Sequence, residues 1–312
     1  MKYAEYLNNL IKDEVKKPAN IVLYGQNINA GSCLGGITRG MKVEEGSKII
    51  NSTNTENSLV GFGFGLMLNG AKAIFFMKQM DFLLLGIDHL VNTYNILRSI
   101  KHESKNGSFT IVAIVVDSGY EGPQSSLNNF SDFCSIAKVP GFAVTNGFDA
   151  DYLLKEYLTK PGFRIIGLSQ KLSKEEVLPV SNPISNFGNG GMFLYSEGDD
   201  VTIVSFNYSF KQTAKLCDAL KKAGIEPTHF NVNSALAVNW EPIVKSVKQT
   251  KKIIVVDDSK SSHIPADSLL AEVCGEQIIK KIVIKRELGN DWLYPTSDEF
   301  NINEDKVINL LK

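Results

Sequence analysis

The sequence predicts an α/β fold with two doubly wound domains, each built on a mainly parallel sheet. Short apolar runs rich in Ile, Val and Phe alternate with longer segments of helical period, which is typical of stacked βα units. The alternation breaks between Lys171 and Asp200, where Pro179, Pro183 and a glycine-rich run over 187–191 are typical of an interdomain linker. We therefore expect a first domain over 1–180, a linker over 181–200 and a second domain over 201–312.

The first domain is expected to contain six strands and four helices. The run 110–117 is the most apolar and predicts a central strand buried on both faces. Asp81 precedes a long run of helical period and is expected to cap it. The expected strands are 21–24, 48–51, 71–76, 110–117, 142–145 and 163–168, and the expected helices are 56–69, 82–100, 129–138 and 149–159.

The same alternation resumes after the linker and predicts a smaller α/β domain. Its expected strands are 201–206, 226–232, 252–258 and 278–284, and its expected helices are 209–223, 241–249, 265–275 and 304–311.

Composition excludes several classes of function. The 312 residues include 33 Lys and Arg against 34 Asp and Glu, a net charge of -1 that gives no global field for nucleic acid or anionic lipid. The first twenty residues lack the apolar core of a signal peptide, and no apolar run is long enough to span a membrane. We expect a cytoplasmic protein with no nucleic-acid or membrane partner. The four widely spaced cysteines predict reduced thiols and no metal site.

Glu56 is the first candidate for chemistry, because it begins a helix directly after a strand. Gly61, Gly63 and Gly65 follow it and would let that helix lie close against the sheet. Two interpretations are open: Glu56 simply favours the helix dipole, or it is a carboxylate held in place for a function.

Residues 48–92 resemble the pyrimidine-binding module of thiamine diphosphate enzymes. The resemblance is greatest to the beta subunit of 2-oxo acid dehydrogenases and extends to the central region of transketolases. Matching features occur in the family's order: Ile49 and Ile50 on a strand, Glu56, the glycine-rich helix, a strand over 71–76, Phe82, and Ile87-Asp88 with Asn92. Later segments over 110–126, 198–223 and 252–260 continue the resemblance, which covers nearly all of 15–312. It implies a transketolase-like pyrimidine-binding domain followed by a transketolase C-terminal-like domain.

The resemblance implies a role for several side chains. Glu56 would hydrogen-bond a ring nitrogen of the cofactor's aminopyrimidine and promote the tautomer that takes the acidic proton from the thiazolium carbon. Phe82 would stack on the pyrimidine ring, and Asn54 and Lys78 would also lie at the cofactor. Lys78 would make the pocket suited to a carboxylate or phosphate, although a surface lysine explains it equally well. Asp88 and Asn92 are expected at a subunit contact.

Besides Lys78, which stands where the family usually has an apolar residue, one further departure from the family's pattern and one absent motif bear on the reaction. The beta subunits carry Gln-His-Ser where this chain has Gln124, Ser125 and Ser126, which puts acyl transfer to a lipoyl group in doubt. The Gly-Asp-Gly motif that holds Mg²⁺ and the cofactor's diphosphate occurs nowhere in the chain. The resemblance therefore implies that a separate alpha-type chain binds Mg²⁺ and the diphosphate half of thiamine diphosphate, commonly in an α2β2 assembly with a contact between beta subunits.

A possible substrate site combines Gln124, Ser125 and His263. His263 follows a strand and precedes a helix, where open α/β sheets bind ligands, but capping by Ser262 or Asp267 explains the same polar cluster. His229 is read as a surface or loop residue.

Three functions remain open at this point. The leading one is the beta-type subunit of a thiamine diphosphate enzyme that cleaves a 2-oxo acid and transfers the resulting acyl or aldehyde unit. Its rivals are a transketolase-like transfer of a two-carbon unit between sugars and a non-catalytic partner that has kept the fold. A nucleotide-binding domain is disfavoured because no G-x-G-x-x-G follows the first strand.

Overall fold

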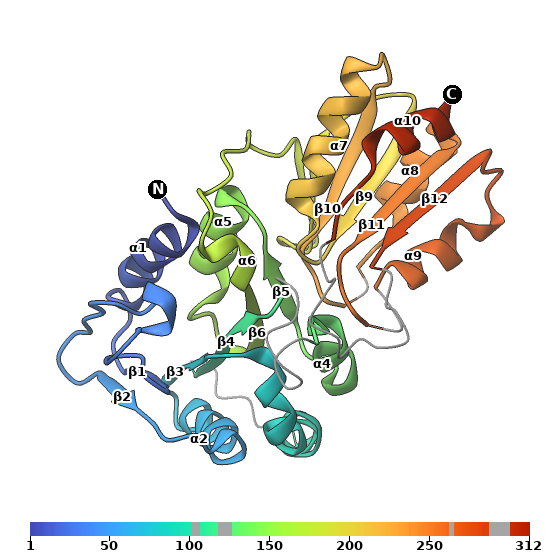
Figure 1. Ribbon diagram of the computed structural model, residues 1–312. Helices are drawn as coiled ribbons and strands as arrows, with labels where there is room; N and C mark the ends of the chain where they lie inside the picture. The colour runs from blue at the N-terminus through green and yellow to red at the C-terminus, as the bar shows by residue number, and fades with distance from the viewer. Residues whose placement is uncertain (101–106, 118–126, 237, 262–264, 287–299) are drawn as a thin grey trace.

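Two six-stranded sheets organise the chain, one in each domain (Figure 1). The computed structural model describes residues 1–100, 107–117, 127–236, 238–261, 265–286 and 300–312. The sheets are mainly parallel and carry helices on both faces, which confirms the predicted fold class.

The first sheet has the strand order β2-β1-β3-β4-β6-β5, and all of its strands are parallel. Every strand expected in this domain is present, with shifted ends. The strands are β1 (Ile21–Gly25), β2 (Lys48–Asn51), β3 (Lys72–Met77), β4 (Ser108–Val115), β5 (Gly141–Val144) and β6 (Gly162–Ser169). β4 lies inside the sheet and is buried at every position but Ile114, as its apolar sequence predicts.

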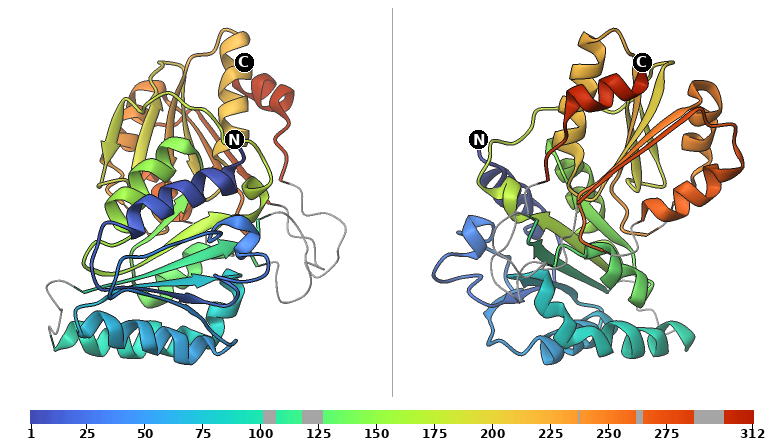
Figure 2. Two further views of the ribbon diagram at one scale, coloured as in Figure 1. Left: turned by 90° about the vertical axis from the view of Figure 1, so that its left-hand side faces the viewer. Right: turned by 45° about the vertical axis from the view of Figure 1, so that its right-hand side comes forward.

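Two groups of helices cover the faces of this sheet. α1 (Tyr3–Val15) and α5 (Gly147–Tyr157) pack on one face, and α2 (Glu56–Leu68), α3 (Tyr94–Ser99) and α4 (Phe130–Ala137) pack on the other (Figures 1 and 2). The short helices η1 (Leu34–Gly36) and α6 (Gln170–Ser173) lie in connections. α1 was not predicted, although Leu7, Ile11 and Val15 repeat every four residues and are fully buried.

The prediction of one continuous helix over 82–100 is wrong about the helix type. The chain there forms a 3-10 helix, η2 (Met80–Gly86), then a π-helical turn, η3 (His89–Thr93), and only then α3. Asp81 is not its cap: the residue before η2 is Gln79, and Asp81 is buried inside the first turn.

The second sheet has the order β12-β11-β9-β10-β8-β7. Its strands are β7 (Ser185–Phe187), β8 (Met192–Ser196), β9 (Val201–Phe206), β10 (Pro227–Val232), β11 (Lys252–Asp257) and β12 (Lys280–Lys285). α7 (Phe210–Lys222) and α10 (Glu304–Leu311) pack on one face, and α8 (Glu241–Thr250) and α9 (Ala266–Glu272), continued by η4 (Val273–Gly275), pack on the other (Figure 2).

The segment 181–200, expected to be a linker, contributes to this second sheet. β8 runs antiparallel to β10, and β7 runs antiparallel to β8. The glycines over 188–191 lie in the turn between these two short strands, and Pro179 and Pro183 precede β7. The division at 180 and 201 stays a prediction.

The domains are joined through β5, the edge strand of the first sheet. The amide of Ala143 donates to the carbonyl of Asn233 over 2.8 Å, and the amide of Ala235 donates to the carbonyl of Gly141 over 2.9 Å. Tyr208 of the second domain is buried in the core of the first. These contacts fix the second domain against the β5 edge of the first sheet. Among the described residues no helix has the length and apolar character needed to cross a membrane.

Candidate functional site

A cavity of about 340 Å³ opens where β1, β2 and β3 end. Gln26 follows β1, the segment 53–56 follows β2, and Lys78 follows β3, and all of them line the cavity. The carboxyl edge of a parallel sheet is where open α/β folds bind ligands. Gly25 permits this convergence, since a Cβ there would lie 2.2 Å from the carbonyl oxygen of Phe76 on β3.

Glu56 is the first residue of α2 and is half-buried on the wall of the cavity. Two glycines bring its helix against neighbouring elements, as the sequence predicts. A Cβ on Gly63 would lie 2.3 Å from the ring of Phe109, and one on Gly61 would lie 2.9 Å from His89. Gly65 has nothing within 4 Å, so the expectation of close packing is wrong there.

Phe82 lies on η2 and is also half-buried on the cavity wall. η2 packs on the first turn of α2: a Cβ on Gly86 would lie 2.7 Å from Val60 and 3.3 Å from the carbonyl oxygen of Glu56. Glu56 and Phe82 are therefore held on two elements that are in direct contact, which limits how far either side chain can move relative to the other.

Among the described residues that line the cavity, one is acidic and one is basic, Glu56 and Lys78. Within the described ranges, neither side chain has a hydrogen bond or an ion pair. A carboxylate, an aromatic ring and amide side chains around one hollow fit a flat ring that offers hydrogen-bonding nitrogens.

Four of the residues implied by the family resemblance thus line one cavity. They are Asn54, Glu56, Lys78 and Phe82. The remaining three, Gln124, Ser125 and His263, lie outside the described residues. Asp88 and Asn92 are exposed and hydrogen-bond each other, Asn92 Nδ2 donating to Asp88 Oδ1 over 2.6 Å. Their expected place at a subunit contact stays a prediction.

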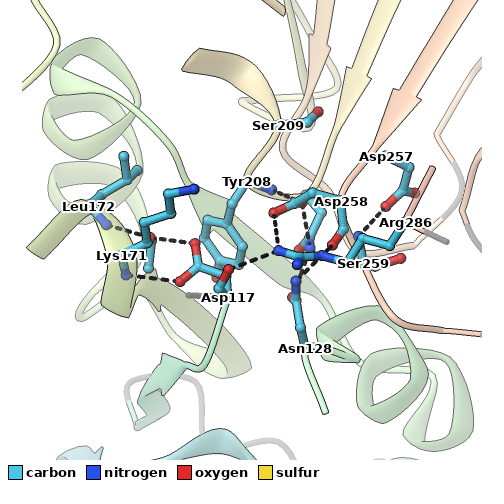
Figure 3. Close-up of polar contacts among 12 residues, drawn as sticks. Asp117, Asn128, Lys171, Leu172, Tyr208, Ser209, Asp257, Asp258, Ser259 and Arg286 are labelled. Atoms are coloured by element: carbon cyan, nitrogen blue, oxygen red, sulfur yellow. Dashed lines mark hydrogen bonds and ion pairs between the residues drawn. The ribbon is translucent and has the colours of Figure 1, made fainter. Parts of the chain in front are cut away.

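A buried polar cluster at the domain boundary was missed by the sequence reasoning (Figure 3). Arg286, after β12, donates to the carbonyl oxygens of Asp117 and Asp258 and approaches a carboxylate oxygen of Asp258 at 3.7 Å. Asn128 Nδ2 donates to the carbonyl of Asp258 over 2.8 Å. The only signal in the sequence was an acid directly after each of two apolar strands, in VVDS and VVDD.

Burial perturbs the acids of this cluster. It raises the pKa of Asp117 to about 6, with the nearby carboxylate of Asp258 adding to the effect. Burial also raises the pKa of Asp257, at the end of β11, to about 7, and Oδ2 of that residue has no hydrogen-bond partner in the described part of the chain. The pKa of Asp258 is raised by burial as well, although Arg286 opposes the shift. Burial at the domain boundary therefore raises the pKa of all three acids.

Histidine and cysteine side chains form no metal centre in the part of the chain that is described. No group of three or more His, Cys, Asp or Glu there is arranged to hold a metal ion. His229, expected at the surface, is instead buried on β10, where Nε2 lies 2.9 Å from Ser205 Oγ, and burial lowers its pKa to about 3.

Comparison with known proteins bears on the fold of both domains. A sequence model of the family described as "Transketolase, C-terminal domain" matches residues 192–284. A solved structure described as a split gene transketolase, inactive beta4 tetramer, superimposes with a TM-score of 0.69 and 14% identity over 98% of this chain and 95% of that one. The chain has a transketolase-like fold. A solved transketolase from Campylobacter jejuni superimposes with a TM-score of 0.63 and 12% identity, over 99% of this chain and 44% of the Campylobacter chain.

Curated relatives confirm the resemblance that the sequence indicates. The beta subunit of a pyruvate dehydrogenase E1 component from Staphylococcus epidermidis is 20% identical over 97% of the transketolase-like chain and 94% of the relative. A mitochondrial pyruvate dehydrogenase E1 beta subunit from Dictyostelium discoideum is 24% identical over 81% of the chain and 72% of the relative.

Proposed function

We propose that this chain is the beta-type, pyrimidine-binding subunit of a thiamine diphosphate-dependent enzyme that cleaves a 2-oxo acid and transfers the resulting acyl or aldehyde unit. The observation that carries the proposal is the unpaired carboxylate of Glu56, half-buried in one cavity with the ring of Phe82. The curated relatives named as pyruvate dehydrogenase E1 beta subunits support the choice of a 2-oxo acid.

Each residue of the cavity has a task in this proposal. Glu56 accepts a hydrogen bond from a ring nitrogen and holds or releases a proton there, because no donor from the described part of the chain competes for its oxygens. Phe82 fixes the plane of the ring, a contact worth about 1 kcal/mol beyond buried area. Asn54 contributes an amide at the rim. Bound thiamine diphosphate supplies the electron sink needed to break a carbon bond beside a carbonyl.

We propose that an alpha-type chain completes the site and makes the enzyme active. It would bind Mg²⁺ and the diphosphate, for which this sequence carries no Gly-Asp-Gly motif. An α2β2 assembly with a contact between beta subunits follows from the family resemblance. A cytoplasmic location remains a prediction of the sequence.

Substitution of Glu56 tests the proposal directly. Glu56→Gln keeps the size of the side chain and removes its ability to take up a proton, so turnover of pyruvate by the reconstituted complex should fall by about 10²-fold or more. Assembly size, measured by light scattering, should not change. The matched control is Glu45→Gln, an exposed acid in the preceding connection. Equal activity of both variants would support the non-catalytic alternative and end the proposal.

Transketolase-type transfer is the second candidate, favoured by the two solved transketolases that share the fold. Both reactions use the same Glu56 and Phe82, so the variant above does not separate them. A substrate comparison separates them: the complex is supplied first with pyruvate, and then with a ketose phosphate plus an aldose acceptor. Formation of a sugar two carbons longer than the acceptor, without release of carbon dioxide, would identify the transketolase reaction.

A further inference from the structure

Gln26 lines the cofactor cavity, and neither the family resemblance nor the proposed chemistry uses it. It directly follows β1, the strand that lies between β2 and β3 in the first sheet (Figure 1). Its side chain is half-buried and has no hydrogen bond in the part of the chain that the structure describes. Glu56 and Gln79 are the other half-buried polar residues of the lining, and Gln79 already has an interaction of its own. Among the described lining residues, Gln26 and Glu56 are therefore the half-buried polar side chains left for a ligand.

The backbone at Gln26 is held by both neighbouring strands. Gly25, the residue before it, pairs with Asn51 on β2 and with Phe76 on β3. The amide of Ser52 also donates to the carbonyl of Gly25 over 3.0 Å. Because the chain is fixed on both sides at this point, the side chain of Gln26 enters the cavity from a fixed position.

β1 is also tied to the helix that carries Glu56. The hydroxyl of Tyr24 donates to the carbonyl of Leu59 on α2 over 2.9 Å, and the ring of Tyr24 stacks on the ring of Phe75 with 5.1 Å between their centroids. Leu59 and Phe75 line the same cavity. Gln26 lies two residues after Tyr24, and Glu56 lies three residues before Leu59. The two polar residues are therefore held at a fixed separation by elements in direct contact.

The carboxamide of Gln26 offers hydrogen bonds that the two charged side chains of the cavity cannot. It presents an acceptor oxygen beside a donor nitrogen, whereas an ionised Glu56 only accepts and Lys78 only donates. An aminopyrimidine has the matching pair, an amino group on the carbon next to a ring nitrogen. Glutamine binds an amino group and a nearby ring nitrogen of adenine in the same bidentate manner. The amide of Gln26 thus fits this edge of the cofactor's ring.

We propose that Gln26 is a binding residue for the cofactor, and that its carboxamide hydrogen-bonds the amino group and the adjacent ring nitrogen of the aminopyrimidine. This inference rests on the proposed function, because it concerns the same cavity. Glu56 then binds the other ring nitrogen, which lies opposite the carbon that carries the amino group. A ring bound at both edges cannot rotate in its own plane, and Phe82 fixes that plane.

The test measures the affinity of the native assembly for thiamine diphosphate and two analogues by titration calorimetry, with Mg²⁺ present. In the proximal analogue a CH group replaces the ring nitrogen next to the amino-bearing carbon, and in the distal analogue it replaces the other ring nitrogen. The wild-type protein should bind each analogue about tenfold more weakly than thiamine diphosphate, as expected when one hydrogen bond is lost and its protein partner is left unpaired.

Gln26→Met keeps the length of the side chain and removes its donors and acceptor. This variant should bind thiamine diphosphate and the proximal analogue equally, because it has no group that distinguishes them. It should still bind the distal analogue about tenfold more weakly than thiamine diphosphate, since Glu56 is unchanged. Gln26→Ala should give the same ratios, which provides a second readout if Gln26→Met fails to fold.

The matched control is Gln249→Met, which changes an exposed glutamine on α8 in the second domain. It should keep both wild-type ratios. A structural effect of Gln26→Met on the cavity would weaken the binding of all three ligands by one common factor, so the ratios separate contact with the ring from a change of shape.

Distinct results would overturn each proposal. The role of Gln26 fails, while Glu56 keeps its own, if the wild type does not discriminate against the proximal analogue, or if Gln26→Met and Gln26→Ala still discriminate against it as the wild type does. If the wild type binds the distal analogue as tightly as thiamine diphosphate, or binds no thiamine diphosphate, the proposed function fails and the role of Gln26 fails with it.

Discussion

Glu56 and Lys78 define the chemistry of the cavity at the scale of single residues. Of the described residues they are the charged ones that line the cavity, and neither has a hydrogen bond or ion pair in that part of the chain. Opposite charges that do not pair with each other leave both available to ligands. Glu56 suits a ring nitrogen, and Lys78 suits an anionic group on the substrate.

Lys78 should therefore determine how well an anionic substrate binds. Lys78→Met should raise the KM for pyruvate about tenfold or more, since a hydrogen bond to a charged group is worth about 1.5–3 kcal/mol. Lys78→Arg retains the charge and should recover most of the loss. The measurement is steady-state kinetics of the complex, with the affinity for thiamine diphosphate measured in parallel. A loss of cofactor affinity alone would assign Lys78 to the diphosphate instead.

The sequence predicted the positions of residues that belong to a recognisable motif, and it did not predict the positions of residues outside any motif. Asn54, Glu56, Lys78 and Phe82 follow strands in the family's order, so their convergence at one sheet edge was predictable. Asp81 was misread as a helix cap, because a cap and a buried acid look alike in sequence. The burial of Asp81 depends on the packing of η2 against α2 and β4, which a pattern over neighbouring residues does not predict.

At the scale of elements, α2 is the part of the fold that places Glu56. Gly63 lets this helix approach β1 and β4, where a Cβ would lie 2.4 Å from Tyr24 Oη and 2.3 Å from Phe109. The hydroxyl of Tyr24 also donates to the carbonyl of Leu59 on α2 over 2.9 Å. The helix is therefore fixed near its centre, about two turns after the acid at its start.

Two glycines of α2 should respond in opposite directions to the same substitution. Gly63→Ala should lower the free energy of unfolding by about 1–3 kcal/mol through overpacking. Gly65→Ala adds a methyl group to open space in a helix interior and should raise stability by up to about 1 kcal/mol. Urea denaturation of both variants checks this. Equal destabilisation would show that the helix does not pack as described.

Elements were predictable where their period was regular. The strands of the first sheet were all found, because apolar runs between turns leave little choice of structure. The run over 80–99 was predicted only as a helix, since hydrophobic period does not distinguish 3-10, π and α geometry. β7 and β8 were missed because they are short and adjoin glycines, and because β8 pairs with β10, which comes much later in the chain, while β7 pairs only with β8.

At the scale of the whole molecule, the two domains meet across buried polar groups. Asp149 of α5 accepts hydrogen bonds from Tyr195 and Asn233 of the second domain over 2.8 and 2.6 Å. Arg286 and Asn128 form the second buried link. Removing one member of such a network leaves a buried group without its partner, so we expect the domains to unfold together.

The buried acids predict how stability depends on pH. The pKa of Asp257 is raised from 3.8 to about 7 by burial, so the folded state holds a proton that the unfolded chain has released between about pH 4 and 7. Stability should therefore fall as pH rises through that window. Asp257→Asn should flatten the fall, measured as the free energy of unfolding in urea at pH 5, 6, 7 and 8. An unchanged slope would mean that Asp257 is ionised in the folded protein throughout.

The most direct test of the account is a structure of the native assembly bound to thiamine diphosphate. We predict that a ring nitrogen of the aminopyrimidine lies about 2.6–3.2 Å from the carboxylate of Glu56, with the ring stacked on Phe82. A cofactor bound elsewhere, or a Glu56 carboxylate that faces solvent while the cofactor is bound, would contradict it.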